Sequence, residues 1–201
     1  MGITERRVRQ QEELKNEIIA QSWAIIEGEG WQALSIRRIA DAIEYSVPVI
    51  YKHFENKEAI LEHFVKAGFD ELSAHIKSAV NPADTAIQQL QQIALAYWDF
   101  AAKRTKLYEI MFGLGIPNCE TINNVLEMKR MSDLMLQAIE GIAQECKNLD
   151  IDKYLKLKTF WSTLHGFIAI ELLSHSTINL QPTATFMDAI ESFIFTLINK
   201  K

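Results

Sequence analysis

Residues 35–61 read SIRRIADAIEYSVPVIYKHFENKEAIL, and this stretch decides the fold of the N-terminal part of the chain. It begins with Ser35, a residue type that caps helices, and then places apolar side chains at helical spacing: Ile36, Ile39, Ala40 and Ile43. After the dipeptide Glu-Tyr, Ser46 begins a second short helix. Pro48 falls in its first turn, where the missing N–H removes no intrahelical hydrogen bond. Two short helices joined by so tight a turn predict a helix-turn-helix.

The second of these helices has one apolar side and one side that faces outward. Ile50 and Phe54 are four residues apart, so we expect both to pack back on the first helix. The outward side then carries Val47, Pro48, Tyr51 and Lys52. Small apolar groups contact thymine methyls, and Tyr, Lys and His donate to phosphates, so this side suits a DNA major groove. Taken singly, Tyr51 and His53 are equally compatible with simply covering a small domain.

The remainder of the chain also has the pattern of helices. One amphipathic stretch ends at Gly28 and Gly30, and another covers residues 56–76. Five further helical stretches are expected at 83–102, 104–113, 119–147, 152–176 and 183–200. No segment alternates apolar and polar residues as a strand would. The sequence therefore predicts an all-α protein of about nine helices, with a three-helix head in residues 1–58 and a larger helical body in residues 59–201.

Charge and composition limit the kinds of partner. The 201 residues carry a formal net charge of -5, yet residues 1–57 hold eight Lys and Arg against nine Asp and Glu. The head is thus nearly neutral, and DNA binding must depend on a local group of donors with a strong salt dependence. No run of about 18 apolar residues exists to span a membrane. Cys119 and Cys146 are far apart, which favours free thiols in a reducing cytoplasm over a metal site or a disulfide.

The N-terminal segment leaves two alternatives open. It lacks the apolar core of a secretory signal. Its run of Arg6, Arg7 and Arg9 is either a solvated tail or an arm that reaches a phosphate or a minor groove.

Residues 10–65 resemble the DNA-binding head of the TetR (tetracycline-repressor) family of bacterial regulators. The resemblance is carried by Ser35, Ile39, Ala40, Tyr51, His53, Phe54, Lys57 and Glu58. It implies that the DNA-binding residues are Ser35, Arg37, Ser46, Val47, Pro48, Val49, Tyr51, Lys52, His53 and Lys57. One position departs from the family pattern, because Glu44 stands where a turn glycine is usual. If that residue needs a positive φ, glutamate costs roughly 1 kcal/mol there.

The body resembles the C-terminal type of this family that has a Trp-His-Gly signature, here Trp161, His165 and Gly166. A helix apolar on two sides, as residues 152–176 are, packs against its own core and against a second subunit. We therefore expect a homodimer through the last two helices. The stripe on the final helix belongs either to the core or to that interface: Phe186, Ala189, Ile190, Phe193, Ile194 and Leu197.

Large aromatic residues with polar tips gather in the body, and buried polar tips need partners. We expect a small, largely apolar ligand whose contacts are Phe64, Trp98, Tyr108, Met111, Phe112, Trp161 and His165. The resulting hypothesis is a repressor that this ligand releases from a palindromic operator. The alternative is a DNA-binding protein whose body docks a protein partner and senses no small molecule. No cofactor or metal is expected, and the five histidines show no metal-ligand spacing, so an enzyme is not expected.

Overall fold

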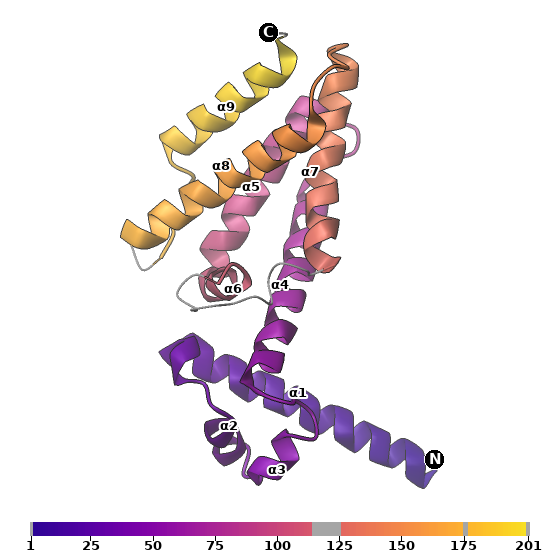
Figure 1. Cartoon of the computed structure of the whole chain (residues 1–201), viewed down its shortest axis with the longest axis vertical. Coiled ribbons are helices and arrows are strands. Elements are labelled where there is room, and N and C mark those ends of the chain that lie inside the picture. The colour runs from indigo at the N-terminus through magenta and orange to yellow at the C-terminus, as the bar shows by residue number, and fades with distance from the viewer. Residues whose placement is uncertain (1, 114–125, 175–176, 200–201) are drawn as a thin grey trace. The chain divides into compact units, whose positions relative to one another are not determined.

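The structure is a computed structural model that describes residues 2–113, 126–174 and 177–199. In these residues all regular secondary structure is helical, which confirms the all-α prediction (Figure 1). The helices are α1 (Ile3–Glu29), α2 (Ile36–Ala42), α3 (Val47–Ile50), α4 (Lys57–Ala79), α5 (Ala86–Lys103), α6 (Thr105–Met111), α7 (Leu126–Glu145), α8 (Lys153–Ser174) and α9 (Ala184–Ile198), with a 3-10 turn at Trp31–Ala33.

The chain divides into two compact units. The first comprises Met1–Val65 and Glu109–Ile122, and the second comprises Lys66–Tyr108 and Asn123–Lys201. Helix α4 therefore contributes residues to both units. No helix in the described part of the chain is long and apolar enough to span a membrane.

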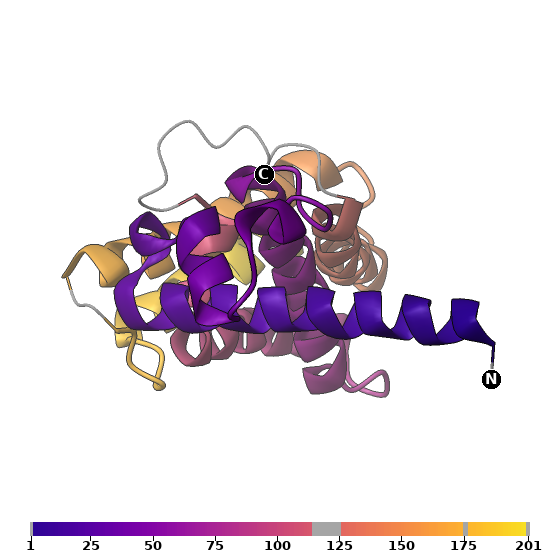
Figure 2. The same ribbon diagram turned by 90° about the horizontal axis from the view of Figure 1, so that it is seen from below.

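The core of the first unit is formed by α1, α2 and α3 with the beginning of α4. Helix α1 buries Ile18, Ser22 and Ile26, and the Ser22 hydroxyl donates to the Ile18 carbonyl at 2.7 Å, so this buried polar group is satisfied. Helix α1 ends before Gly30, whose φ of 84° is readily adopted only by glycine. Figures 1 and 2 both show the N-terminal end of α1 extending past α2 and α3.

The turn after α2 has the hydrogen bonds of a Schellman motif. The Tyr45 N–H donates to the Ala40 carbonyl at 2.9 Å, and the Glu44 N–H donates to the Asp41 carbonyl at 3.3 Å. Glu44 lies in the left-handed region with a φ of 57°. Residue 44 therefore does have a positive φ, and its glutamate occupies a backbone conformation that favours glycine.

The second unit is a bundle in which α5, α7, α8 and α9 pack on one another (Figure 1). Helix α5 begins at Ala86 rather than at residue 83, because the Thr85 hydroxyl accepts from the Gln88 N–H and so caps the helix. The Ala86 N–H donates to Glu145 of α7 at 3.0 Å. Gly141 of α7 lies so close that a Cβ there would be 2.8 Å from the Ala86 Cβ. Residues 119–125 of the predicted seventh helix lie outside the described residues.

Candidate nucleic-acid interface and the polar cluster of the body

Helix α3 presents its outer side to solvent while its inner side is anchored in the head. Ile50 and Phe54 are buried, as the spacing predicted. Pro48 and Lys52 are exposed, Val47 and Val49 are half-buried, and Tyr51 has an exposed fraction of 53%. A tyrosine so exposed is available to a partner. The hydrogen bonds of α3 continue to Phe54, whose N–H donates to the Ile50 carbonyl at 3.0 Å.

The two serines that begin the helices behave differently. The Ser35 hydroxyl accepts from the Arg38 N–H at 3.2 Å and caps α2. Ser46 occupies the same position before α3, but its side chain makes no capping hydrogen bond. The exposed Ser46 hydroxyl therefore stays outside the capping of α3, beside Val47 and Pro48.

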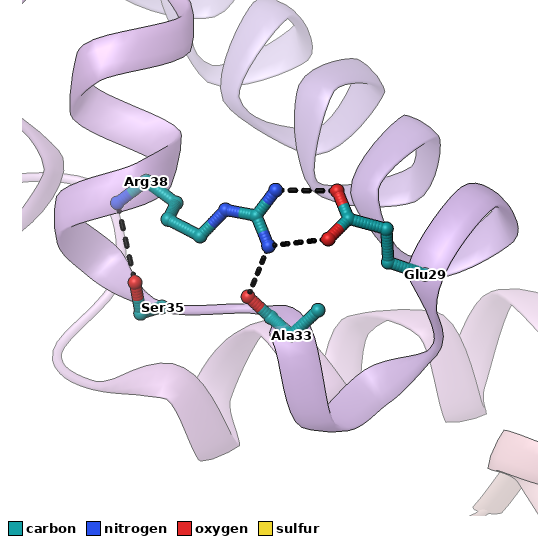
Figure 3. Close-up of polar contacts among 4 residues, drawn as sticks. All are labelled: Glu29, Ala33, Ser35 and Arg38. Atoms are coloured by element: carbon teal, nitrogen blue, oxygen red, sulfur yellow. Dashed lines mark hydrogen bonds and ion pairs between the residues drawn. The ribbon is translucent and has the colours of Figure 1, made fainter.

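Arg38 fixes α2 to the end of α1, a contact that sequence reasoning missed (Figure 3). Its guanidinium donates to both carboxylate oxygens of Glu29, at 2.5 and 3.0 Å, and to the Ala33 carbonyl at 3.1 Å. The hydrogen bond and charge of Arg38 lower the pKa of Glu29. Both side chains are exposed, so the pair serves mainly to orient α2. Arg37, one residue earlier, is exposed.

Lys57 is held within the head at the first residue of α4. Its ammonium donates to the Trp31 carbonyl at 3.0 Å and lies 4.4 Å from the centroid of the Trp31 indole ring. Partial burial lowers the pKa of Lys57, and the Glu58 carboxylate opposes that shift. Lys57 was predicted to contact a phosphate, and one N–H of its ammonium is thus already donated to the Trp31 carbonyl. His53 is half-buried beside exposed Lys52.

The residues predicted to bind a ligand fall into both units. Phe64, Met111 and Phe112 belong to the first unit, where the Phe64 ring lies 5.5 Å from that of Trp23. Trp98 is fully buried in the second unit, where its N–H donates to the Asn179 carbonyl at 2.8 Å.

The second unit joins Tyr108, Trp161 and His165 in one hydrogen-bonded cluster around Tyr97. The Tyr97 and Tyr108 hydroxyls lie 3.1 Å apart, and the Trp161 N–H donates to the Tyr97 hydroxyl at 3.2 Å. The Tyr108 hydroxyl lies 2.7 Å from Nδ1 of His165. A ligand was expected because buried polar tips need hydrogen-bond partners. In these hydrogen bonds the partners are other side chains of the same chain. The spacing of residues along one helix carries no sign of such pairing between helices.

Trp161 can only donate, so the Tyr97 oxygen accepts in the hydrogen bond between these two side chains. Either hydroxyl can donate in the hydrogen bond between Tyr97 and Tyr108, and the donor between the Tyr108 hydroxyl and Nδ1 of His165 depends on the histidine tautomer. An accepting Nδ1 requires a neutral imidazole with its proton on Nε2. Burial lowers the pKa of His165 in agreement with this state, and burial raises the pKa of both tyrosines.

Helix α9 turns its aromatic stripe into the core of the single chain. Phe186, Ile190, Phe193, Ile194 and Leu197 are all buried, and the Phe193 ring lies 5.1 Å from that of Phe160 in α8. These five residues therefore belong to the core. A different set of apolar side chains on the last two helices is exposed: Leu155, Ile170, Leu173, Phe195 and Ile198.

Two family models match the chain. Residues 18–64 match "Bacterial regulatory proteins, tetR family", and residues 90–193 match "Tetracyclin repressor-like, C-terminal domain". No curated protein matches the sequence.

Solved structures share the fold at low sequence identity. A protein of unknown function from Rhodococcus sp. RHA1 is 23% identical with a TM-score of 0.73, over 92% of this chain and 96% of that one. The TetR family regulator PfmR from Thermus thermophilus is 16% identical with a TM-score of 0.62, over 90% and 96%. The fatty acid degradation regulator FadR from Bacillus halodurans is 17% identical with a TM-score of 0.64, over 92% and 94%.

The matched residues cover both the helix-turn-helix head and the helical body. This family consists of bacterial DNA-binding regulators and not of enzymes. The chain belongs to the TetR family of transcriptional regulators.

Proposed function

We propose that this regulator is a cytoplasmic repressor that binds a palindromic operator as a homodimer through α3. The observation that carries the proposal is the exposed face of α3, where Tyr51 projects beside Pro48 and Lys52 from a buried base. Ser35, Arg37, Ser46, His53 and Lys57 assist by contacting phosphates, and Val47 and Val49 offer small apolar groups to bases.

The test is the affinity of Tyr51 variants for an operator selected by the protein from random duplexes. Tyr51→Ala is expected to weaken operator binding strongly without changing the thermal stability, because the side chain is exposed. Tyr51→Phe keeps the ring and separates its contribution from that of the hydroxyl. Wild-type affinity in Tyr51→Ala would show that α3 is not the reading helix.

The homodimer is proposed to form through the outer faces of α8 and α9. The support is a stripe on α8 that repeats at helical spacing and is exposed except at half-buried Gly166: Leu155, Thr159, Ser162, Gly166, Ile170 and Leu173. Leu173 is 88% exposed and Phe195 of α9 is 66% exposed. A Cβ at Gly166 would meet nothing within 4 Å, so the backbone there is open to a close neighbour.

Phe195→Glu tests this interface, since Phe193 is a core residue and a charge there would disrupt the fold of the chain. Phe195→Glu is expected to yield a folded monomer in sedimentation equilibrium at micromolar concentration. Leu149→Glu is the matched control, because Leu149 is similarly exposed but lies outside α8 and α9. A monomeric wild type would contradict the proposal.

We propose further that a small, largely apolar molecule binds in the body and releases the operator, and that the body is of the Trp-His-Gly type. The support is the cluster of Tyr108, Trp161 and His165, in which half-buried Trp161 and His165 flank buried tyrosines. A ligand with one polar group would take the place of Tyr108 at His165. By linkage it releases DNA only as far as it prefers the protein state that does not bind the operator.

A body that docks a protein partner remains the second candidate, favoured by the hydrogen bonds that join the cluster internally. A thermal-shift screen of apolar compounds distinguishes the two. The ligand proposal requires a compound that stabilises the wild type, weakens operator binding and loses potency in His165→Ala. Absence of any such compound, together with co-purification of a stoichiometric protein partner, would favour docking.

A further inference from the structure

We propose that the N-terminal end of α1, residues 4–11, is a rigid helical arm that contacts the DNA backbone beside the site read by α3. This inference rests on the proposed DNA-reading role of α3. The family match to the head begins at Ile18, which is also the first buried residue among the described side chains of α1. The arm therefore precedes the residues that the family model matches.

The arm is helical although no side chain of residues 4–11 is buried. Its residues, TERRVRQQ, include good helix formers, and the Glu5 carboxylate accepts from the Gly2 N–H at 3.0 Å and completes the N-terminus. At about 1.5 Å per residue the arm is about 12 Å long, the length of three to four base pairs. A helix of this length that buries nothing in its own domain is available to a partner.

Charge is distributed unevenly around the arm. Helical spacing continues the buried face of Ile18 and half-buried Leu14 toward the N-terminus and places four residues on it: Thr4, Arg7, Val8 and Gln11. These residues include a cation, hydrogen-bonding groups and a small apolar side chain, but no acid. Glu5 and Glu13 lie toward the opposite side, and Glu12 lies at the edge of this face. The cation of this face is Arg7, which borders one groove together with Glu13 and Glu17 and can contact a phosphate from there.

Val8 and Gln11 of this face lie beside α3, whereas Arg7 borders a second groove that reaches Tyr45 in the turn before α3. A groove of about 350 Å³ is bordered by Val8, Gln11, Glu12, Leu14 and Lys15 of α1 and by Val49, Lys52 and His53 of α3 and its following turn. Glu12 is the one acidic group in this lining, against Lys15 and Lys52. The Lys15 ammonium lies 5.9 Å from the centroid of the Phe54 ring. If Lys52 and His53 contact phosphates of a duplex, the neighbouring phosphates of the DNA backbone would therefore lie beside the arm.

The test compares two duplexes, using an operator that the full-length wild-type protein selects from random DNA. One ends at the outermost selected base pair, and the other carries five more base pairs on each side. The wild type is expected to bind the longer duplex roughly tenfold more tightly, as a charge-assisted hydrogen bond implies. Arg7→Gln keeps the helix propensity but should abolish this gain and lower the salt slope by about 0.9 for each phosphate that is no longer neutralised.

Arg6→Gln is the matched control, because Arg6 lies on the side of the helix away from α3. It should keep the gain from the flanking base pairs. Equal affinity of the wild type for both duplexes would overturn the arm proposal, as would equally weakened binding in the two variants, which would indicate a general charge effect. A wild type that selects no operator would contradict the proposed function instead, before the arm is tested.

Discussion

Glu44→Gly is expected to stabilise the head, because Glu44 has a φ of 57° at the position after α2 where a Schellman motif favours glycine. A residue with a Cβ costs about 1–2 kcal/mol in this conformation. Glycine loses more backbone entropy on folding, which offsets about 0.5–1 kcal/mol of that gain. The net increase in the free energy of unfolding should be about 0.5–1 kcal/mol, or roughly 0.3 M in the urea midpoint.

The assay is urea unfolding followed by tryptophan fluorescence, with Glu44→Ala as the control for removal of the carboxylate. Alanine keeps the Cβ, so it should leave the stability nearly unchanged. Lys147→Gly provides a second case, because Lys147 has a φ of 54° at the equivalent position after α7. Equal stabilisation by alanine and glycine at Glu44 would refute the backbone argument and point to the charge.

Two further changes probe the body. Gly141→Ala should lower the free energy of unfolding by about 1–3 kcal/mol, because its Cβ would meet the Ala86 Cβ at 2.8 Å. Gly28→Ala in α1 is the control, because a Cβ there meets nothing within 4 Å, and it should stabilise the protein slightly. Equal effects of the two substitutions would contradict the packing argument. Since burial lowers the pKa of His165, the unfolded chain takes up its proton first as the pH falls, so stability should decrease below about pH 6.5. His165→Asn should reduce that decrease in urea titrations between pH 7 and 5, and an unchanged pH dependence would show that burial does not keep His165 neutral.

The helix-turn-helix could be predicted from the sequence because its signals are local. The Ser35 cap, the apolar spacing of Ile39 and Ile43, and Pro48 in the first turn of α3 act within one or two helical turns. The same local spacing correctly placed Ile50 and Phe54 on the buried side of α3.

Only the tertiary structure decided which helical faces meet. The stripe containing Phe193 fitted a core or an interface equally well, and packing on Phe160 of α8 places it in the core. Tyr108 and His165 are 57 positions apart, so their hydrogen bond depends on how α6 and α8 lie together and has no signature in either helix. Backbone hydrogen bonds in helices join residues four apart and follow local sequence, whereas side-chain partners between helices follow from the packing of the whole bundle.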